Sequence, residues 1–304
     1  MKRKILAAGT IAFDTLETPN GNRERIIGGS GQHFSIAATL FTQVELSGII
    51  GADFPKEHLA LLNKRGVGTG NVKITDGKSF FWHGRYKGAM NGAETLETQI
   101  NVLAEYDPVM NAEGKKCEVL FVANFSPDKQ LKAINEAEGA KIVITDTMNY
   151  WITSALEDLK KVMKRTDIFI INEHEARLLT GETNIMKALH KVIEMGPRTI
   201  VIKRGEYGSF IYRDDEKIFF APAYPVKDLV DPTGAGDTFA GGFVGYLAVS
   251  PDYNNFNELK KAMLYGSSTA SFAVQGFGSE GIIKATRKDV DARYNELLSS
   301  IKID

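Results

Sequence analysis

Short apolar runs alternate with amphipathic stretches along most of this chain. The apolar runs are rich in valine and isoleucine and end at glycine, asparagine or aspartate, as buried strands do. The strands predicted in this way cover residues 5–8, 44–50, 119–123, 142–145, 168–171 and 199–202. The stretches between them predict helices over residues 32–41, 56–64, 128–138, 152–164, 173–179, 185–194 and 239–249. Strand–helix alternation of this kind predicts an α/β fold, with a mostly parallel central sheet that helices cover on both faces.

A small or polar residue follows several of the predicted strands. These residues are Gly9, Asn124, Asp146, Asn172 and Lys203. Because ligands of open α/β sheets bind outside the carboxyl ends of the strands, these positions are candidates for a binding site.

Two segments, residues 11–27 and 75–104, interrupt the alternation, since they are polar, carry alternating aromatic side chains and lack a helical period. They predict a small β-sheet that projects from the core as a lid. The predicted division is a core of residues 1–10, 28–74 and 105–304 and a lid of residues 11–27 and 75–104. Two other interpretations stay open: a solvated hairpin without a role, or a dimer contact made by Phe80, Phe81 and Trp82.

The composition is that of an ordinary globular protein, with 304 residues, 43% hydrophobic and 25% charged. The formal net charge of −1 argues against a nucleic-acid partner, which would require a basic face. Because Cys117 is the single cysteine, neither an internal disulfide nor a multi-cysteine metal site can form. No segment reaches the roughly 20 apolar residues of a membrane helix, and the apolar part of the N-terminus is too short for a signal peptide. We therefore expect a soluble, cytoplasmic protein that binds neither nucleic acid nor membranes.

The segment from Asp231 to Phe243 carries the most specific chemistry. Gly234, Ala235 and Gly236 precede Asp237, and an apolar, helix-like run follows. Such small residues leave backbone N–H groups uncovered, and a helix that begins there adds unpaired N–H groups and the positive end of its dipole. The turn therefore predicts an anion site, with a carboxylate beside it that can accept a proton from a hydroxyl. An anion site next to a base indicates phosphoryl transfer to an alcohol, from which a lid would exclude water.

Other phosphate-binding motifs do not fit this segment. No Gly-Lys-Ser/Thr follows, as it would in a Walker loop, and the dinucleotide pattern Gly-x-Gly-x-x-Gly should open the first βαβ unit. The alternative for Asp237 is a structural role as a carboxylate at the helix N-terminus.

The same segment resembles the C-terminal signature of the ribokinase-like, or PfkB-type, carbohydrate kinases. Residues 28–38 resemble the double-glycine segment of that family, residues 172–175 its Asn-x-x-Glu motif, and residues 203–208 its strand and turn near the nucleotide. The order and spacing of these motifs fit from Ile5 to about Gly281. The resemblance implies a Rossmann-like α/β core, a β-sheet lid and, in many members, a homodimer made through the lids.

The resemblance also implies roles at the phosphoryl end of the site. Asp237 matches the catalytic base, which we expect to stay ionised because the helix dipole favours the anion. Gly234, Ala235 and Gly236 match the anion hole. The nucleotide ATP is expected beside residues from three parts of the chain, namely Lys203, Gly205, Gly208, Thr233 and Asn172.

Metal ions are implied at two further places. Asn172 and Glu175 match the pair that holds Mg²⁺ and its waters, and Mg²⁺ needs few protein ligands. Asp231 matches a residue near a monovalent cation, K⁺, in several members. Without the resemblance, Asn172 and Glu175 would be interpreted as the polar first turn of a helix.

The acceptor is expected on the other side of the turn, beside Asp14, Gly28, Gly29, Gln32, His33 and Asn124. Asp14 matches the aspartate that binds acceptor hydroxyls, although it could equally cap a turn. The glycine pair matches the hinge that moves with the lid. The chain departs from the family at His33, where sugar-specific members carry asparagine, so the acceptor specificity does not transfer. A lone histidine at this place is more often packed than catalytic.

We predict an ATP-dependent kinase that phosphorylates a hydroxyl of a sugar or sugar derivative, with a nucleoside as the alternative acceptor. The base of a nucleoside would need aromatic neighbours, for which the candidates are Phe13, Phe34, Phe81, Trp82 and Tyr86. The lid cations His83, Arg85 and Lys87 could bind a phosphate on the acceptor or could simply face water. A non-catalytic homologue is the least favoured interpretation, because Asp237 and the glycine turn are present.

Overall fold

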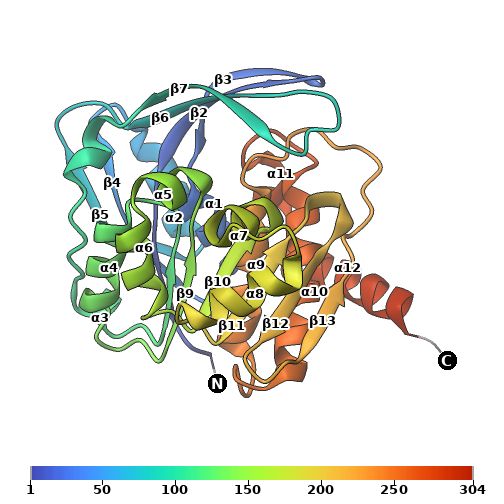
Figure 1. The fold of residues 1–304 in the computed structure, drawn as a ribbon. Helices are drawn as coiled ribbons and strands as arrows, with labels where there is room; N and C mark the ends of the chain where they lie inside the picture. The colour runs from blue at the N-terminus through green and yellow to red at the C-terminus, as the bar shows by residue number, and fades with distance from the viewer. Residues whose placement is uncertain (1, 303–304) are drawn as a thin grey trace.

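The computed structural model describes residues 2–302 and confirms the predicted α/β fold. A nine-stranded sheet, in the order β13-β12-β11-β10-β9-β8-β1-β4-β5, forms its centre (Figure 1). Neighbouring strands from β11 to β5 in this order run parallel, and β12 and β13 add an antiparallel edge. The strands are β1 (Ile5–Ala8), β4 (Val44–Gly51), β5 (Val67–Thr75), β8 (Val119–Val122), β9 (Ile142–Asp146), β10 (Ile168–Asn172), β11 (Thr199–Lys203), β12 (Ser209–Arg213) and β13 (Ile218–Ala221).

Helices cover both faces of this sheet (Figure 1). They are α1 (Ser30–Ala38), α2 (Lys56–Lys64), α3 (Ala112–Lys115), α4 (Pro127–Glu136), α5 (Asn149–Ser154), α6 (Leu156–Met163), α7 (Glu173–Thr180), α8 (Ile185–Glu194), α9 (Ala235–Val249), α10 (Phe256–Ala273), α11 (Glu280–Lys284) and α12 (Arg287–Ile301), with 3-10 turns η1 (Asn101–Glu105) and η2 (Gly205–Tyr207). The single helix predicted over residues 152–164 is wrong. The chain leaves helical geometry at Ala155, with φ −142° and ψ 38°, so α5 and α6 are separate helices.

A small sheet lies across one end of the core (Figure 1). Its strands, in the order β3-β2-β6-β7, are β2 (Ala12–Thr18), β3 (Gly21–Gly28), β6 (Phe80–Tyr86) and β7 (Ala93–Gln99). We call this sheet the lid. The β2–β6 pair is parallel, and the other two pairs are antiparallel. The predicted domain boundaries and a homodimer through the lid stay predictions.

Alternate residues of the buried strands enter two different cores. In β8, for example, Val119 and Phe121 belong to the cluster under α1, α9 and α10, whereas Leu120 and Val122 belong to the cluster on the opposite face. This period of two is the reason that the strands read as continuous apolar runs in the sequence.

Helix α9 is wedged between α1 and α10 because it presents glycines to both. A Cβ atom on Gly241 would lie 2.5 Å from the carbonyl oxygen of Phe34 in α1, and one on Gly242 would lie 2.5 Å from Oγ1 of Thr269 in α10. The small residues after Asp237 therefore allow close helix packing, which fixes the place where α9 begins.

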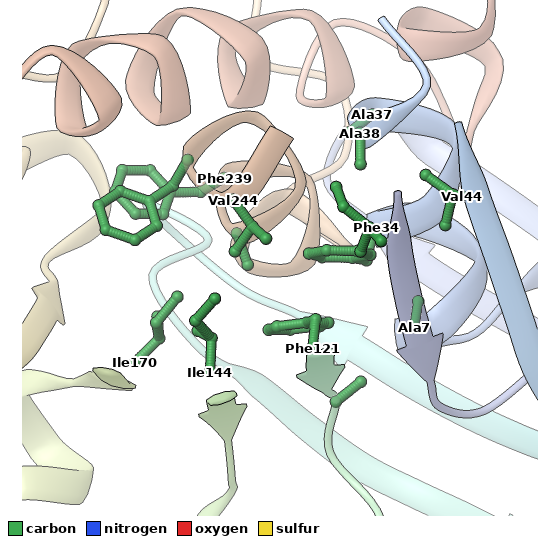
Figure 2. Close-up of a cluster of buried hydrophobic side chains, with 14 of the residues drawn as sticks. Ala7, Phe34, Ala37, Ala38, Val44, Phe121, Ile144, Ile170, Phe239 and Val244 are labelled. Carbon is green, nitrogen blue, oxygen red and sulfur yellow. The ribbon is translucent and has the colours of Figure 1, made fainter. Parts of the chain in front are cut away.

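The packing next to α1 predicts a strong dependence on Phe34. Its ring is fully buried and stacks on Phe121 with centroids 3.8 Å apart and planes 7° apart (Figure 2). Phe34→Ala is expected to lower the free energy of unfolding by about 3–5 kcal/mol, measured by urea denaturation, because it leaves a cavity. The control Phe220→Ala removes a ring that is 59% exposed and should change stability little. Equal losses in the two variants would contradict this account of the core.

Candidate active site

The candidate residues at the strand ends do lie along one edge of the sheet. Asp146, Asn172 and Lys203 are the last residues of the neighbouring strands β9, β10 and β11. The N-terminus of α9 adjoins them, since a Cβ atom on Gly236 would lie 3.2 Å from Nζ of Lys203. The carboxyl-terminal edge of the parallel sheet thus meets the glycine turn.

The glycine turn places two backbone amides at the start of α9. Gly234 adopts a left-handed conformation, with φ 72° and ψ 1°, and its carbonyl oxygen accepts a hydrogen bond from the Thr238 amide at 2.8 Å. The Ala235 amide donates to the carbonyl oxygen of Pro232 at 3.1 Å. Within residues 2–302, the amides of Gly234 and Gly236 have no such acceptor. Among residues 234–236 the anion-binding capacity of the turn therefore resides in these two amides, because the Ala235 amide is already engaged. The Asp237 amide also has no backbone acceptor in the described part of the chain and lies against its own carboxylate.

Asp237 lies in the first turn of α9, and its carboxylate accepts no hydrogen bond from another side chain within the described chain. Burial, and to a smaller extent the nearby carboxylate of Asp146, raise the pKa of this carboxyl, Lys203 opposes both, and the resulting pKa is about 7. The expectation that the helix dipole keeps Asp237 fully ionised is therefore wrong, because burial and a like charge outweigh the dipole. Near neutral pH both protonation states of Asp237 are populated.

A lysine is held among acidic groups behind the turn. Nζ of Lys203 lies 2.7 Å from Oδ2 of Asp146, which is almost fully buried. Burial alone would lower the pKa of Lys203, but the carboxylates of Asp146, Glu175 and Asp237 outweigh it and raise the pKa. Lys203 is thus already paired, and the group as a whole holds more acidic side chains than basic ones.

Asn172 and Glu175 form a reciprocal cap at the start of α7. The Glu175 amide donates to Oδ1 of Asn172 and the Asn172 amide donates to Oε2 of Glu175, both at 2.8 Å. Burial raises the pKa of Glu175 to about 7, against the influence of Lys203. Within residues 2–302, no three His, Cys, Asp or Glu side chains are grouped so that they could hold a metal by themselves. A metal at this edge would therefore need water or a ligand to complete its coordination.

The carboxylate of Asp231 joins two segments next to the glycine turn by accepting hydrogen bonds from their backbone amides. Asp231 is fully buried, its Oδ1 accepts from the Thr233 amide and its Oδ2 accepts from the Gly278 amide, each at 2.9 Å. Asp231 therefore fastens the loop at residue 278 to the turn that precedes α9.

Gly205 begins the 3-10 turn η2 at the end of β11, and Gly208 directly follows that turn. Both have positive φ angles, 56° and 82°, and a Cβ atom on Gly208 would lie 2.2 Å from the carbonyl oxygen of Ala221. These positions require glycine for the backbone itself. Tyr207, between them, is 70% exposed.

On the predicted acceptor side, Asp14 and Gly28 are in direct contact. A Cβ atom on Gly28 would lie 1.9 Å from Oδ2 of Asp14, so glycine makes room for the carboxylate. Gly29 follows with φ 101°, a conformation that favours glycine. Burial, and to a smaller extent Asp231 and Asp237, raise the pKa of Asp14, the Gly29 amide opposes them, and the resulting pKa is about 8. Asp14 therefore faces the same region as the turn before α9.

Gln32 and His33 are buried in the first turns of α1 with polar atoms unused. Oε1 of Gln32 lies 2.9 Å from Nε2 of His58, while Nε2 of Gln32 and both ring nitrogens of His33 have no partner in the described structure. Burial lowers the pKa of His33 to about 4, which keeps the ring neutral. Its ring atoms lie 2.6 Å from the position of a Cβ on Gly234. His33 is thus a packed neutral residue that abuts the glycine turn.

Asn124 lies near this region but is engaged by neighbours. Its Oδ1 accepts from the indole of Trp151 in α5 at 2.9 Å, and its Nδ2 lies 3.0 Å from the sulfur of Met148. These contacts tie the end of β8 to α5.

The lid places some of its predicted residues at the site and others away from it. Trp82 is opposite Asp14 in the β2–β6 pair, so both side chains lie on one face, and Tyr86 follows on that face. The hydroxyl of Thr233 donates to the Tyr86 hydroxyl at 3.2 Å. The prediction that Phe34 could contact the base of a nucleoside is wrong, because its side chain is fully buried in the core. Phe13 and Phe81, which are paired with each other, occupy the other face of the pair.

The lid cations do not converge on the site. Nε2 of His83 and Nε of Arg85 bind the carboxylate of Glu17 at 2.9 and 2.6 Å, and Lys87 pairs with Glu94 at 2.8 Å. These pairs engage all three side chains within the lid and favour the interpretation that they face water. Sequence reasoning missed the contact between Tyr86 and Thr233, because only the folded lid brings these distant segments together.

The pKa values predict that stability falls as the pH rises. Asp14 and Asp237 keep their protons in the folded state up to about pH 8 and 7, whereas the unfolded chain releases them near pH 4. Between those limits the folded state binds more protons, so the free energy of unfolding decreases with increasing pH. Urea denaturation should show lower stability at about pH 8.5 than at about pH 5.5.

Asp14→Asn should reduce that difference, and the exposed Asp76→Asn should not. If the change with pH is the same in both variants, Asp14 does not hold its proton in the folded state.

Comparisons with known proteins identify the family and the fold. The model of the pfkB family of carbohydrate kinases matches residues 6–285. The cytidine kinase of Thermococcus kodakarensis is 30% identical over 254 residues, which cover 81% of this chain and 90% of that protein. The nucleoside kinase of Methanothermobacter thermautotrophicus is 26% identical, with 95% of this chain and 94% of that protein covered.

A solved structure of an E. coli protein assigned as a ribokinase II, in complex with ATP and Mg²⁺, superimposes with a TM-score of 0.80. The identity is 20%, and 97% of this chain and 99% of that chain are covered. At this identity the likeness concerns the fold.

Across residues 2–302 the helices are too short or too polar to cross a membrane.

Proposed function

Because the chain belongs to the pfkB family of carbohydrate kinases, we propose that it transfers the γ-phosphoryl group of ATP to a hydroxyl of a nucleoside. Its relatives are kinases, and the chain is a phosphotransferase of the sugar and nucleoside kinase type. Two relatives that align over most of their length are a cytidine kinase and a nucleoside kinase, which favours a nucleoside over the free sugar that the sequence ranked first. Trp82 and Tyr86 beside Asp14 fit an acceptor with both an aromatic base and hydroxyl groups.

The observation that carries the proposal is the pairing of Asp237 with the two free amides of the glycine turn. In the proposed reaction the acceptor oxygen forms a bond to the γ-phosphorus, and the bond from that phosphorus to the β–γ bridging oxygen breaks. ADP leaves with the electron pair, and the hydroxyl proton passes to Asp237. A pKa of about 7 suits this task, because the carboxylate is present at neutral pH and is basic enough to take the proton.

The amides of Gly234 and Gly236 would stabilise the charge that develops on the transferred group, together with the N-terminal dipole of α9. The partial exposure of residues 234–237 leaves these groups accessible to a ligand. Ala235 contributes only its small size, because its amide donates a hydrogen bond to the carbonyl oxygen of Pro232.

Mg²⁺ fits the carboxyl edge of the sheet on the grounds of charge. Asp146, Glu175 and Asp237 surround the ammonium of Lys203, so a further positive charge would be favoured there. Asn172 and Glu175 would hold the ion, mostly through water, and it would neutralise the charge of the triphosphate. Lys203, Gly205, Gly208 and Thr233 would border the nucleotide.

On the acceptor side, the proposed binding residues are Asp14, Gly28, Gly29, Gln32, His33 and Asn124. The unpaired buried nitrogens of Gln32 and His33 support this assignment, because such atoms are rare unless a ligand or water binds them. A K⁺ ion near Asp231 stays a prediction, since both oxygens of that carboxylate already bind backbone amides.

A coupled assay of ADP release tests the acceptor class directly. Cytidine, uridine, adenosine, inosine, ribose, deoxyribose and fructose would each be supplied with ATP and Mg²⁺, with and without K⁺. We expect nucleoside-dependent ADP release, with a nucleoside monophosphate identified by phosphorus NMR. Release with sugars alone would reject the nucleoside, and release that no acceptor stimulates would reject the kinase assignment.

A further inference from the structure

One lid side chain reaches the glycine turn itself. Tyr86 is the last residue of β6, a strand of the lid, and the lid lies across one end of the core (Figure 1). Its hydroxyl accepts a hydrogen bond from Oγ1 of Thr233 at 3.2 Å, and Thr233 directly precedes Gly234. Thr233 in turn donates its amide to the buried carboxylate of Asp231. A continuous chain of hydrogen bonds thus joins the lid to the base of the turn.

The Tyr86 hydroxyl lies among the carboxylates of the site. Burial raises the pKa of Tyr86 well above its usual value, and Asp231, Asp14 and Asp237 raise it further, while the bond from Thr233 opposes them. These carboxylates come from β2, from the turn and from α9, so the hydroxyl is placed between the acceptor side and the phosphoryl side. It stays protonated, and its hydrogen remains available because Thr233 supplies the hydrogen of their shared bond.

Two other polar contacts fasten the lid to core loops around the same site. Nδ2 of Asn20 donates to the carbonyl oxygen of Leu229 at 2.6 Å, and Nδ2 of Asn91 donates to Glu206 at 3.2 Å. The first contact adjoins the loop that leads into Asp231, and the second adjoins the turn η2. The lid is therefore seated on the core at several points, of which Tyr86 is the one that touches residue 233.

We propose that Tyr86 is a positioning residue that couples the seating of the lid to the geometry of the glycine turn. This inference rests on the proposed function, because it assumes that phosphoryl transfer takes place at that turn. With the lid seated, the bond to Thr233 restrains the residue before Gly234 and so helps to fix the two free amides. With the lid lifted, the restraint is lost and water reaches the site, which favours hydrolysis of ATP over transfer.

Four variants test the coupling by steady-state kinetics. Tyr86→Phe and Thr233→Val each remove one hydroxyl of the pair, the double variant removes both, and Tyr150→Phe is the control because that tyrosine is 57% exposed on α5. We expect each single variant of the pair to lower kcat about tenfold. Each should also raise the ratio of inorganic phosphate to phosphorylated acceptor, because water replaces the acceptor hydroxyl in the attack on the γ-phosphorus. The double variant should be no worse than the poorer single variant.

Hydrogen exchange gives a readout that does not need activity. In Tyr86→Phe the amides of residues 228–240 and of the lid should exchange faster than in wild type, with Tyr150→Phe unchanged and the melting temperature of both variants close to wild type. Single-variant effects that multiply in the double variant, or unchanged exchange in Tyr86→Phe, would overturn the coupling. If Tyr86→Phe matches wild type while Asp237→Asn is inactive, the inference fails and the proposed function stands. If no acceptor is phosphorylated by wild type, the proposed function fails, and the exchange data still decide whether Tyr86 restrains the turn.

Discussion

Replacing Asp237 by asparagine is expected to lower kcat by about 10²–10⁴-fold, which is the usual contribution of a general base. Asparagine has the shape of aspartate but cannot accept the hydroxyl proton. Its substitution should leave the ion pair of Lys203 with Asp146 in place, since that bond does not involve Asp237. ATP affinity should therefore change little, whereas turnover should collapse. Steady-state kinetics at saturating ATP and acceptor, with calorimetric titration of ATP in the presence of Mg²⁺, measure the two effects separately.

The control for Asp237→Asn is Asp76→Asn, an exposed aspartate after β5. This control should keep the wild-type kcat and ATP affinity. A kcat of Asp237→Asn within about threefold of wild type would remove Asp237 from the chemistry, because a base contributes far more than that. Loss of ATP binding in the same variant would instead assign Asp237 to the nucleotide site.

The fold was largely predictable because the parallel strands are buried on both faces. β1 and β8 are apolar throughout, β10 is apolar up to Asn172, and β11 is apolar between its end residues, and these runs alternate with helices. The edge strand β5 is half-exposed and lacks such a run, whereas β13 is apolar but only four residues long and half-exposed, and the sequence revealed neither. Helix α10 was also missed, since it is buried through small residues such as Gly266, Ser267 and Ser268, which give no amphipathic period.

The site was predictable where a motif is local and unpredictable where distant segments set its chemistry. The turn from Gly234 to Asp237 can be recognised from a few consecutive residues. The pKa of Asp237 depends on Asp146 and Lys203, which reach it from other strands, so no local pattern could show that burial outweighs the helix dipole. The engaged amide of Ala235 likewise follows from the geometry of the turn. The hydrogen bond between Tyr86 and Thr233 could not be predicted either, because it joins distant segments and depends on how the lid lies on the core.

The second large effect is expected at Gly234, where Gly234→Ala should lower kcat by about 10²–10³-fold and also destabilise the protein. Its φ of 72° disfavours any residue with a Cβ, and that Cβ would lie 2.6 Å from the ring of His33. The ring is almost fully buried, and its neighbour Phe34 is fixed in the core, so His33 cannot move away cheaply. The turn must shift instead, which displaces the two free amides from the transferred group.

Gly181→Ala separates this contact from the strain of the backbone alone. Gly181 has φ 70°, close to that of Gly234, but a Cβ there meets no atom within 4 Å. It should lose only the roughly 1–2 kcal/mol of a left-handed alanine and keep full activity. Gly236→Ala gives a second comparison inside the turn, because the nearest atom to its Cβ would be Nζ of Lys203 at 3.2 Å, which is a looser contact than that of Gly234 with the His33 ring. Urea denaturation and kcat of the three variants should therefore rank Gly234→Ala as the most damaging in both measures. Equal stability losses in Gly234→Ala and Gly181→Ala, with unchanged kcat in both, would show that His33 does not confine the turn and that the amides there do not serve the reaction.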